Sequence, residues 1–271
     1  MSEDRLRLSY EGPVAIITNN NVDKHNAFDD EMDARLFEIL AELRDNPDVR
    51  AAVWRAEGKS WSSGRDVSQI GRQQLEISHH QLMQRGQRGI QQLFELDVPI
   101  IVAHKGWTIG GSFQRALLCD VRIAAEGARF MLPELVHGVI ADTGGVGCLF
   151  QMCGHGVVSD MVLTGRPLSA EEALRYGVVS RVVPAEELDS TALEMAEKVA
   201  KSPPISVKFA RRVIRNLHEP EIRTSMHDEL LMQTVINKAP DFDEFRTARA
   251  EERAPSFPGV WVKPPVPARK D

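Results

Sequence analysis

The sequence contains few cysteines, no excess of basic charge and no long apolar run. Its three cysteines, Cys119, Cys148 and Cys153, are too few for a disulfide framework and lack zinc-type spacing. We expect small core thiols in a protein of a reducing compartment, the cytoplasm, with no bound metal. The 33 Lys and Arg residues against 39 Asp and Glu give a formal net charge of −6. Nucleic acid is therefore not an expected partner.

Several features that mark other classes of protein are also missing. No apolar run approaches the roughly 18 residues of a membrane span, and the polar start lacks the apolar core of a secretory leader. No G-x-G-x-x-G follows a strand-like run, and Val53 stands where a P-loop before Lys59 needs a glycine. Residues 110–114 lack the last glycine of a nucleophile elbow. These absences argue against membrane insertion, dinucleotide redox chemistry, P-loop phosphate binding and α/β-hydrolase catalysis.

What is present is the pattern of a layered α/β protein. The 271 residues are 42% hydrophobic and 27% charged, which suffices for a large core. Short apolar runs alternate with helical periodicity, and that alternation predicts strands and helices in layers. The predicted strands are residues 14–18, 51–54, 99–103 and 121–124, and the predicted helices are residues 32–43, 77–96 and a short one after the glycine turn at 106–111.

The pattern changes after Pro184, where helical segments follow one another without a strand. They are predicted at residues 187–201, 205–216, 221–237 and 242–252. The end of the chain is rich in prolines that exclude helix, namely Pro255, Pro258, Pro264, Pro265 and Pro267. We predict a core over residues 1–200, a helical region for oligomerisation over 201–254 and a Pro-rich tail over 255–271.

Two glycine-bearing segments are candidates for binding a developing negative charge. One is the loop at residues 62–66, and the other is Gly110-Gly111 at the start of a helix. Glycine lets a ligand approach the backbone closely, and free N–H groups at a helix start carry partial positive charge. Two such amides facing one point would form an oxyanion hole. The alternative interpretation is two unrelated tight turns.

A third segment, residues 133–145, places two carboxylates among apolar neighbours. Such surroundings raise the pKa of a carboxyl group toward the range that is useful for proton transfer, which makes Glu134 and Asp142 acid/base candidates. The alternatives are a helix N-cap for Asp142 and a structural ion pair for Glu134. We interpret His137 as a pocket-wall or surface residue. The adjacent pair His79-His80 points to different faces of a polar helix, which favours a solvated surface.

Together these segments resemble the crotonase superfamily, the enoyl-CoA hydratase/isomerase family, from about Val14 to Phe257. The matching strings are residues 14–18 and 23–28 (the family's first strand and coenzyme-A loop), 63–66, 106–112, 119–126 and 165–173. The resemblance implies an α/β fold, a spiral of β-β-α turns with a C-terminal helical trimerisation region. Trimers, often paired into hexamers, are the implied assembly.

The resemblance also implies an activity and a set of site residues. An acyl-CoA thioester carbonyl would lie between the N–H groups of Arg65 and Gly111, which stabilise an enolate. Coenzyme A enters as part of the substrate, so no separate cofactor is implied. The residues that match the family's coenzyme-A contacts are Lys24, His25, Ala27, Ser63, Gly64, Asp66 and Gly110.

The chain departs from the hydratase pattern at two positions. Hydratases use two glutamates; Glu134 matches the second, but the first falls on Gln114, which is neutral and could only orient a water. Asp142 stands where hydratases usually have glycine and where dienoyl-CoA isomerases have a functional aspartate. The resemblance therefore implies either addition of water to an enoyl-CoA or migration of its double bond. A CoA-ester binding protein without catalysis is the remaining alternative.

The resemblance to the family also leads to expectations for the acyl-chain pocket and for the C-terminal region. The pocket walls for the acyl chain are expected between residues 67 and 92, which leaves chain length and shape unspecified. Near the C-terminus the family's usual aromatic and lysine fall on Arg249 and Glu252. The C-terminal contact to the coenzyme is therefore not expected in its usual form.

Overall fold

The computed structural model describes residues 2–69 and 77–259. Its main sheet has six strands in the order β1-β2-β3-β4-β6-β9. They are β1 (Leu6–Glu11), β2 (Val14–Asn19), β3 (Ala51–Ala56), β4 (Ile100–His104), β6 (Val121–Ala125) and β9 (Arg181–Val183). Only β1 pairs antiparallel; the other pairs are parallel. The four predicted strands are all present, but the run at residues 14–18 is the second strand, because the more exposed β1 precedes it.

A second, three-stranded sheet lies beside the site. It consists of β5 (Trp107–Ile109), β7 (Arg129–Met131) and β8 (Leu168–Ser169), in that order. Each strand is too short for a periodic signal, so none was predicted. The successions β4-β5-α4 (α4, Gly110–Leu117) and β6-β7-α5 (α5, Gly145–Thr164) repeat a strand-strand-helix unit, as the spiral requires.

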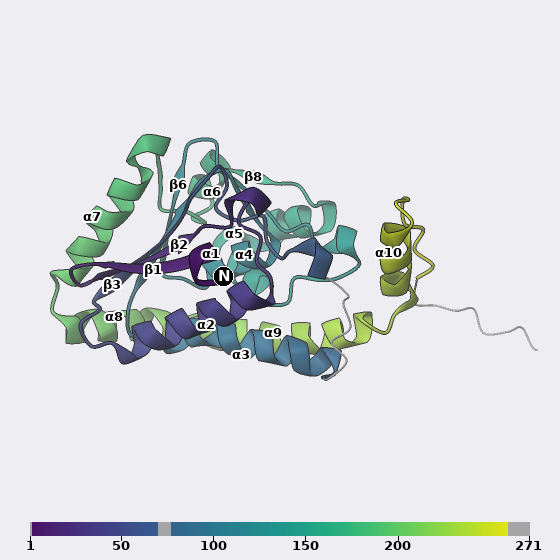
Figure 1. The fold of residues 1–271 in the computed structure, drawn as a ribbon, viewed down its shortest axis with the longest axis horizontal. Coiled ribbons are helices and arrows are strands. Elements are labelled where there is room, and N and C mark those ends of the chain that lie inside the picture. The colour runs from purple at the N-terminus through teal and green to yellow at the C-terminus, as the bar shows by residue number, and fades with distance from the viewer. Residues whose placement is uncertain (1, 70–76, 260–271) are drawn as a thin grey trace, which may run out of the picture.

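Helices cover both faces of the main sheet (Figure 1). The helix α7 (Leu188–Ala200) packs on the face that carries Val53, Ile101 and Ile123. The alternate residues of the same strands face the larger core beneath α2 (Asp30–Asp45) and α3 (His79–Glu95). The strands β2 and β4 are therefore buried on both faces, and each begins with an uninterrupted apolar run, residues 14–17 and 100–103.

Both large helices begin at side-chain caps, which explains their boundaries. The Asp29 carboxylate accepts a hydrogen bond from the Met32 amide at the start of α2. Ser78 and Gln81 form a capping box at the start of α3. The short helices are α1 (Ser2–Arg5) and α6 (Ala170–Arg175), and the 3-10 turns are η1 (Val22–Lys24), η2 (Val67–Gln69), η3 (Glu134–His137) and η4 (Ala185–Glu187).

The C-terminal region is helical as predicted. It contains α8 (Pro204–Asn216), α9 (Glu219–Ile236) and α10 (Pro240–Ala250). The helix α9 runs alongside α3, whereas α10 stands at the far end of the molecule (Figure 1). Because α9 packs on the core and contributes to the main cavity, the helical region is part of the site; the proposed boundary at residue 200 stays a prediction. Residues 260–271 of the predicted tail lie outside the described residues.

Two expectations need adjustment. By length and hydropathy, α5 is apolar enough to cross a membrane, so the statement that no segment approaches that limit was wrong. Its backbone is not one regular helix, however, because Gly154 has φ 73° and ψ 172°. All three cysteines are free, but only Cys119 and Cys148 are core residues; Cys153 is half-buried.

Candidate active site

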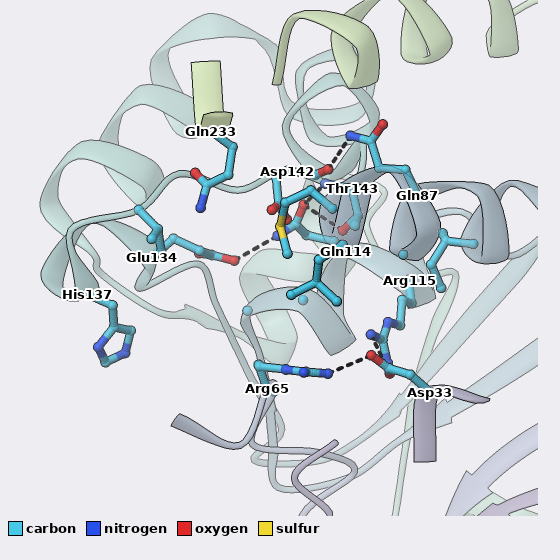
Figure 2. Close-up of a pocket in the computed structure, with 18 of the residues that line it drawn as sticks. Asp33, Arg65, Gln87, Gln114, Arg115, Glu134, His137, Asp142, Thr143 and Gln233 are labelled. Carbon is cyan, nitrogen blue, oxygen red and sulfur yellow. Dashed lines mark hydrogen bonds and ion pairs between the residues drawn. The ribbon is translucent and has the colours of Figure 1, made fainter. Parts of the chain in front are cut away.

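One cavity of about 580 Å³ lies between α2, α3, α4, η3 and α9. Eight of the predicted catalytic and coenzyme-A-binding residues line it, namely Ser63, Gly64, Arg65, Gly110, Gly111, Gln114, Glu134 and Asp142. Side chains from distant parts of the chain converge on it (Figure 2). Val67, Leu82, Met83 and Gly86, from the described part of the predicted wall at residues 67–92, line the cavity, and their contact with an acyl chain stays a prediction.

The four remaining predicted residues, Lys24, His25, Ala27 and Asp66, do not line the cavity but lie next to it. The Ser63 amide donates to the His25 carbonyl over 2.9 Å, which fixes this loop against the cavity wall. Lys24 Nζ lies 2.8 Å from Asp66 Oδ2, and this contact lowers the pKa of Asp66 to about 2. Their expected role in holding coenzyme A stays a prediction.

The two glycine segments are joined side by side. The Ile109 amide donates to the Ser62 carbonyl over 3.0 Å, next to a parallel bridge between Ser62 and Thr108. Gly64 has φ +90°, and a Cβ there would lie 2.7 Å from the Ile109 carbonyl oxygen. Only glycine permits this close approach. The interpretation as two unrelated turns is therefore wrong.

Both candidate amides are available for a ligand. Gly111 lies in the first turn of α4, where backbone N–H groups have no acceptor within the helix. Among the hydrogen bonds of the described residues, the Arg65 amide has no protein acceptor. Both residues line the same cavity. The arrangement could hold a carbonyl oxygen that gains negative charge.

Glu134 begins the 3-10 turn η3 and faces the glycine turn. Its Oε1 accepts a hydrogen bond of 2.8 Å from Gln114 Nε2, and a Cβ on Gly110 would lie 3.5 Å from the same oxygen. Its Oε2 is buried without a hydrogen-bond partner among the described residues. Burial raises the pKa of Glu134 to about 7, although the Gln114 hydrogen bond acts in the opposite direction. No cation pairs with it in the described chain, so the ion-pair interpretation was wrong.

Gln114 is fixed at both ends of its amide. Its Oε1 accepts from the Thr143 amide over 2.9 Å and from the Thr143 hydroxyl over 3.0 Å, while Nε2 donates to Glu134. An amide oxygen has two lone pairs, so both are occupied. Only the second N–H of Gln114 remains for a substrate or a water.

Asp142 is not the N-cap of α5. The cap position is Gly144, with φ 81°, and Glu229 from α9 accepts the hydrogen bond of the Gly144 amide over 2.8 Å. Burial raises the pKa of Asp142 to about 6, while the positive charges of Arg115 and Arg65 act against this rise. The cavity therefore contains two carboxyl groups that can gain or lose a proton near neutral pH.

Buried amide and carboxylate side chains hold the irregular segment that carries Asp142. Gln87 Nε2 donates to the Asp142 carbonyl over 2.7 Å and to the Met226 carbonyl over 2.8 Å. Gln233 Oε1 accepts from the Ile140 amide over 3.2 Å. The sequence analysis missed Gln87, Gln233 and Glu229. The signal that the sequence offered for them was a polar residue at a helix position where the apolar periodicity predicts burial.

The histidines are placed differently from expectation. His79 lines the cavity and is half-buried, and burial lowers its pKa. His80 Nδ1 lies 2.9 Å from the Thr234 hydroxyl of α9. The solvated-surface interpretation of this pair was therefore wrong, because α9 covers the start of α3. His137 lines the cavity as a wall residue and packs against the Phe245 ring at 5.8 Å.

Among the described residues, no metal site accompanies the carboxylates. Across residues 2–69 and 77–259, no three His, Cys, Asp or Glu side chains are grouped so that they could hold a metal ion. The two carboxyl groups and the two backbone amides could support proton transfer beside a developing negative charge.

Comparison with known proteins agrees with this geometry. The sequence model of the enoyl-CoA hydratase/isomerase family matches residues 9–260. The carnitinyl-CoA dehydratase of Salmonella typhi is 34% identical over 266 residues, which cover 96% of this chain and 100% of that protein. An enoyl-CoA hydratase/isomerase from Pseudoalteromonas atlantica T6c superimposes with a TM-score of 0.84 at 29% identity, covering 93% of this chain and 99% of that one.

A third similarity concerns a structure in complex with a coenzyme-A derivative. Methylmalonyl-CoA decarboxylase in complex with 2-nitronate-propionyl-CoA gives a TM-score of 0.79 at 26% identity, covering 94% of this chain and 98% of that one. These likenesses confirm the predicted fold class and cover nearly the whole chain. The chain belongs to the enoyl-CoA hydratase/isomerase family, the crotonase superfamily.

Proposed function

We propose that this enzyme adds water to, or removes it from, the α,β double bond of an enoyl-CoA thioester. The observation that carries the proposal is the position of Glu134. Its carboxyl group lies against the glycine turn, its pKa is about 7, and one of its oxygens has no hydrogen-bond partner among the described residues. A group with such a pKa both accepts and donates a proton at neutral pH.

The two backbone amides would bind the thioester carbonyl. As the α-proton leaves, that oxygen becomes an enolate, and the N–H groups of Arg65 and Gly111 would stabilise its charge. Removing one donor of such a site typically costs about 2.7–4 kcal/mol of transition-state stabilisation. In dehydration, Glu134 would accept the α-proton, the C–O bond at the β-carbon would break, and the leaving hydroxyl would depart as water once it is protonated. In hydration, water would add to the β-carbon and give up a proton, and Glu134 would donate a proton to the α-carbon.

Asp142 would exchange the proton with the water, because Gln114 cannot accept one. The oxygen of Gln114 is saturated by the two Thr143 donors, so it offers no lone pair to a water proton. Its free N–H can still donate to the oxygen of that water. Asp142, whose pKa is about 6, can accept the water proton in hydration and return it in dehydration.

A spectrophotometric assay on two thioesters in parallel tests this function. One is a 2-trans-enoyl-CoA, and the other is a 3,5-dienoyl-CoA. Loss of the conjugated enoyl absorbance, sensitive to Glu134→Gln, is the expected result. Formation of the 2,4-dienoyl chromophore without hydration would replace this proposal with the second candidate.

The second candidate is migration of a double bond, as in dienoyl-CoA isomerases. Asp142 favours it, because a buried carboxyl group with a raised pKa can pass a proton to a distant carbon of the same acyl chain. The relatives named dehydratases favour the first candidate. The third candidate is a protein that only binds CoA esters. Such a protein would bind the thioesters and show no activity in either assay.

We also propose a homotrimer or a dimer of trimers as the assembly. The helices α8 and α9, together with the C-cap residue of α8, expose large apolar side chains in the single chain, and such a surface is unfavourable in water. They are Ile205, Phe209, Val213, Ile214, Leu217, Leu231, Met232 and Val235. Sedimentation equilibrium should give a mass of three or six chains, and a monomer would contradict the proposal.

A further inference from the structure

The helix α3 contains two glycines in its interior, Gly86 and Gly89. A glycine inside a helix destabilises it relative to alanine, because the unfolded chain is more flexible and no side chain packs on the helix. The two glycines are one turn apart, but their surroundings differ. Each therefore has its own structural reason, and both reasons concern the space between α2 and α3.

Gly86 lies on the side of α3 that faces the cavity. Leu82 and Met83, one turn before it, line the cavity, and so does Ile90, one turn after it. Residues at these spacings share one face of a helix. Gly86 itself lines the cavity, and a Cβ placed on it would meet no atom within 4 Å. The missing side chain therefore leaves free space in the cavity and makes no close packing contact.

Gly89 faces α2, against which α3 packs (Figure 1). A Cβ on Gly89 would lie 2.2 Å from Cζ of Phe37, so a larger residue would collide with the ring. The ring of Phe37 thus lies directly on the backbone of α3, and it also lines the cavity. Both glycines therefore enlarge the space between the two helices, one by lacking a side chain and the other by letting an aromatic ring lie close.

This space begins at the proposed reaction centre. Gln87, the residue after Gly86, donates from Nε2 to the Asp142 carbonyl over 2.7 Å. Asp142 lines the same cavity as Arg65 and Gly111, whose amides would bind the thioester carbonyl. An acyl group whose β-carbon lies beside Asp142 can therefore continue along α3 past Gly86.

The walls along this path are mainly apolar. The apolar lining residues of the two helices are Ala34, Phe37, Leu82, Met83 and Ile90. The carboxylate of Asp33, which also lines the cavity, is held in ion pairs of 2.7 Å with both Arg65 and Arg115. Apolar walls favour a hydrocarbon group over water.

We propose that Gly86 determines which acyl groups the enzyme accepts, and that its substrates carry an apolar chain that extends several carbons beyond the β-carbon along α3. Each methylene that is buried there favours binding by roughly fourfold. A side chain at position 86 would occupy the space that this chain takes. The inference rests on the proposed function only in placing the acyl group in this cavity.

A series of trans-2-enoyl-CoA esters with four, six, eight and ten carbons tests the proposal. We expect kcat/KM of the wild type to be at least tenfold higher for the octenoyl ester than for the butenoyl ester. Gly86→Leu should lower kcat/KM for the octenoyl ester by at least tenfold and change that for the butenoyl ester less than threefold. A wild type without preference for the longer ester, or a Gly86→Leu variant that keeps the preference, would overturn the proposal.

A second glycine provides the matched control. Gly156 of α5 is exposed, lies outside the cavity, and likewise has no atom within 4 Å of an added Cβ. Gly156→Leu should keep the wild-type ratio of kcat/KM values. Thermal unfolding should show Gly86→Leu to be at least as stable as the wild type, because leucine is the better helix former and has room. If that variant does not fold, Gly86→Ala and Gly86→Val replace it, and an unchanged ratio in both would overturn the proposal.

Binding measurements distinguish this inference from the proposed function. Calorimetric titration with butyryl-CoA and octanoyl-CoA, which have no double bond to hydrate, gives their relative Kd values. If no enoyl ester is hydrated, but octanoyl-CoA binds at least tenfold more tightly and Gly86→Leu removes that difference, the proposed function fails and the role of Gly86 stands. If enoyl esters are hydrated, but neither kcat/KM nor Kd depends on chain length, the proposed function stands and the role of Gly86 fails.

Discussion

Gln114 Nε2 donates a 2.8 Å hydrogen bond to Oε1 of Glu134, so a neutral amide holds the carboxyl group whose pKa lies near 7. The amide cannot turn to offer its oxygen, because Thr143 occupies that end with two donors. The contact orients Glu134, and its other oxygen, Oε2, has no hydrogen-bond partner in the described part of the chain. A glutamine at this position is therefore compatible with proton transfer by Glu134.

Replacing Glu134 by glutamine should remove catalysis and leave binding intact. The amide keeps the shape and the contact to Gln114 but cannot accept the α-proton. We expect kcat/KM to fall by about 10²–10⁴-fold, the usual contribution of a general acid/base, with the Kd of the thioester nearly unchanged. Glu126→Gln, on an exposed turn, is the matched control. Equal turnover by Glu134→Gln and wild type would contradict the assignment.

The dependence of activity on pH should be bell-shaped. Hydration requires an ionised Asp142, whose pKa is about 6, and a protonated Glu134, whose pKa is about 7. Activity therefore decreases below about pH 6, as Asp142 is protonated, and above about pH 7, as Glu134 loses its proton. Initial rates measured between pH 5 and 9 give kcat/KM as a function of pH and so the shape of this profile. A flat profile over that range would exclude both groups from the rate-determining proton transfer.

Removing the amide beside Glu134 should shift the alkaline limb of that profile. The Gln114 hydrogen bond lowers the pKa of Glu134, so Gln114→Ala should raise it. We expect the alkaline limb to move to higher pH, together with a loss of kcat from poorer orientation. Gln151→Ala, on the exposed side of α5, is the control. An unchanged alkaline limb would show that Gln114 has only a packing role.

Glu229 makes the stability of the fold dependent on pH. Burial raises its pKa to about 7, so its neutral form is favoured in the folded state. Its contribution is fully present below the unfolded pKa near 4.3 and is lost as pH rises through about 7. Glu229→Gln can keep the contacts to Gly144 and Ser225 without this loss.

The difference should grow as the pH rises from about 4.3 to about 7 and should be complete in alkaline solution. At pH 8 the Glu229→Gln variant should be more stable than the wild type by about 2 kcal/mol, and at pH 4 the two should be equal. Urea unfolding at both pH values measures this. A variant that is less stable at pH 8 would show that the ionised carboxylate contributes more to the Gly144 contact than its burial costs.

The sequence was sufficient for those parts of the fold and site that depend on local patterns. Uninterrupted apolar runs predicted the parallel strands, and apolar neighbours predicted raised pKa values for Glu134 and Asp142. The short strands of the second sheet were missed, because two or three residues carry no periodicity. The exposed strand β1 was missed because it contains few apolar residues.

The tertiary partners of the site could not be predicted in the same way. Nothing local indicates that Gln87, on α3, reaches the Asp142 carbonyl, or that Glu229, on α9, caps α5. The sharing of Asp33 by two arginines likewise depends on how α2, α4 and the loop at residues 62–66 meet. These contacts join residues far apart in the chain, so they follow from the packing of helices rather than from spacing.

Exchange of α-protons tests the central claim most directly, because it requires an enolate and no particular double bond. Butyryl-CoA is incubated with the enzyme in D₂O, and NMR follows its α-methylene signal. The account predicts deuterium incorporation by the wild type and by Glu126→Gln, and at least 10²-fold slower incorporation by Glu134→Gln. Bound butyryl-CoA that exchanges no proton, or equal exchange in Glu134→Gln, would contradict proton transfer by Glu134 beside the two backbone amides.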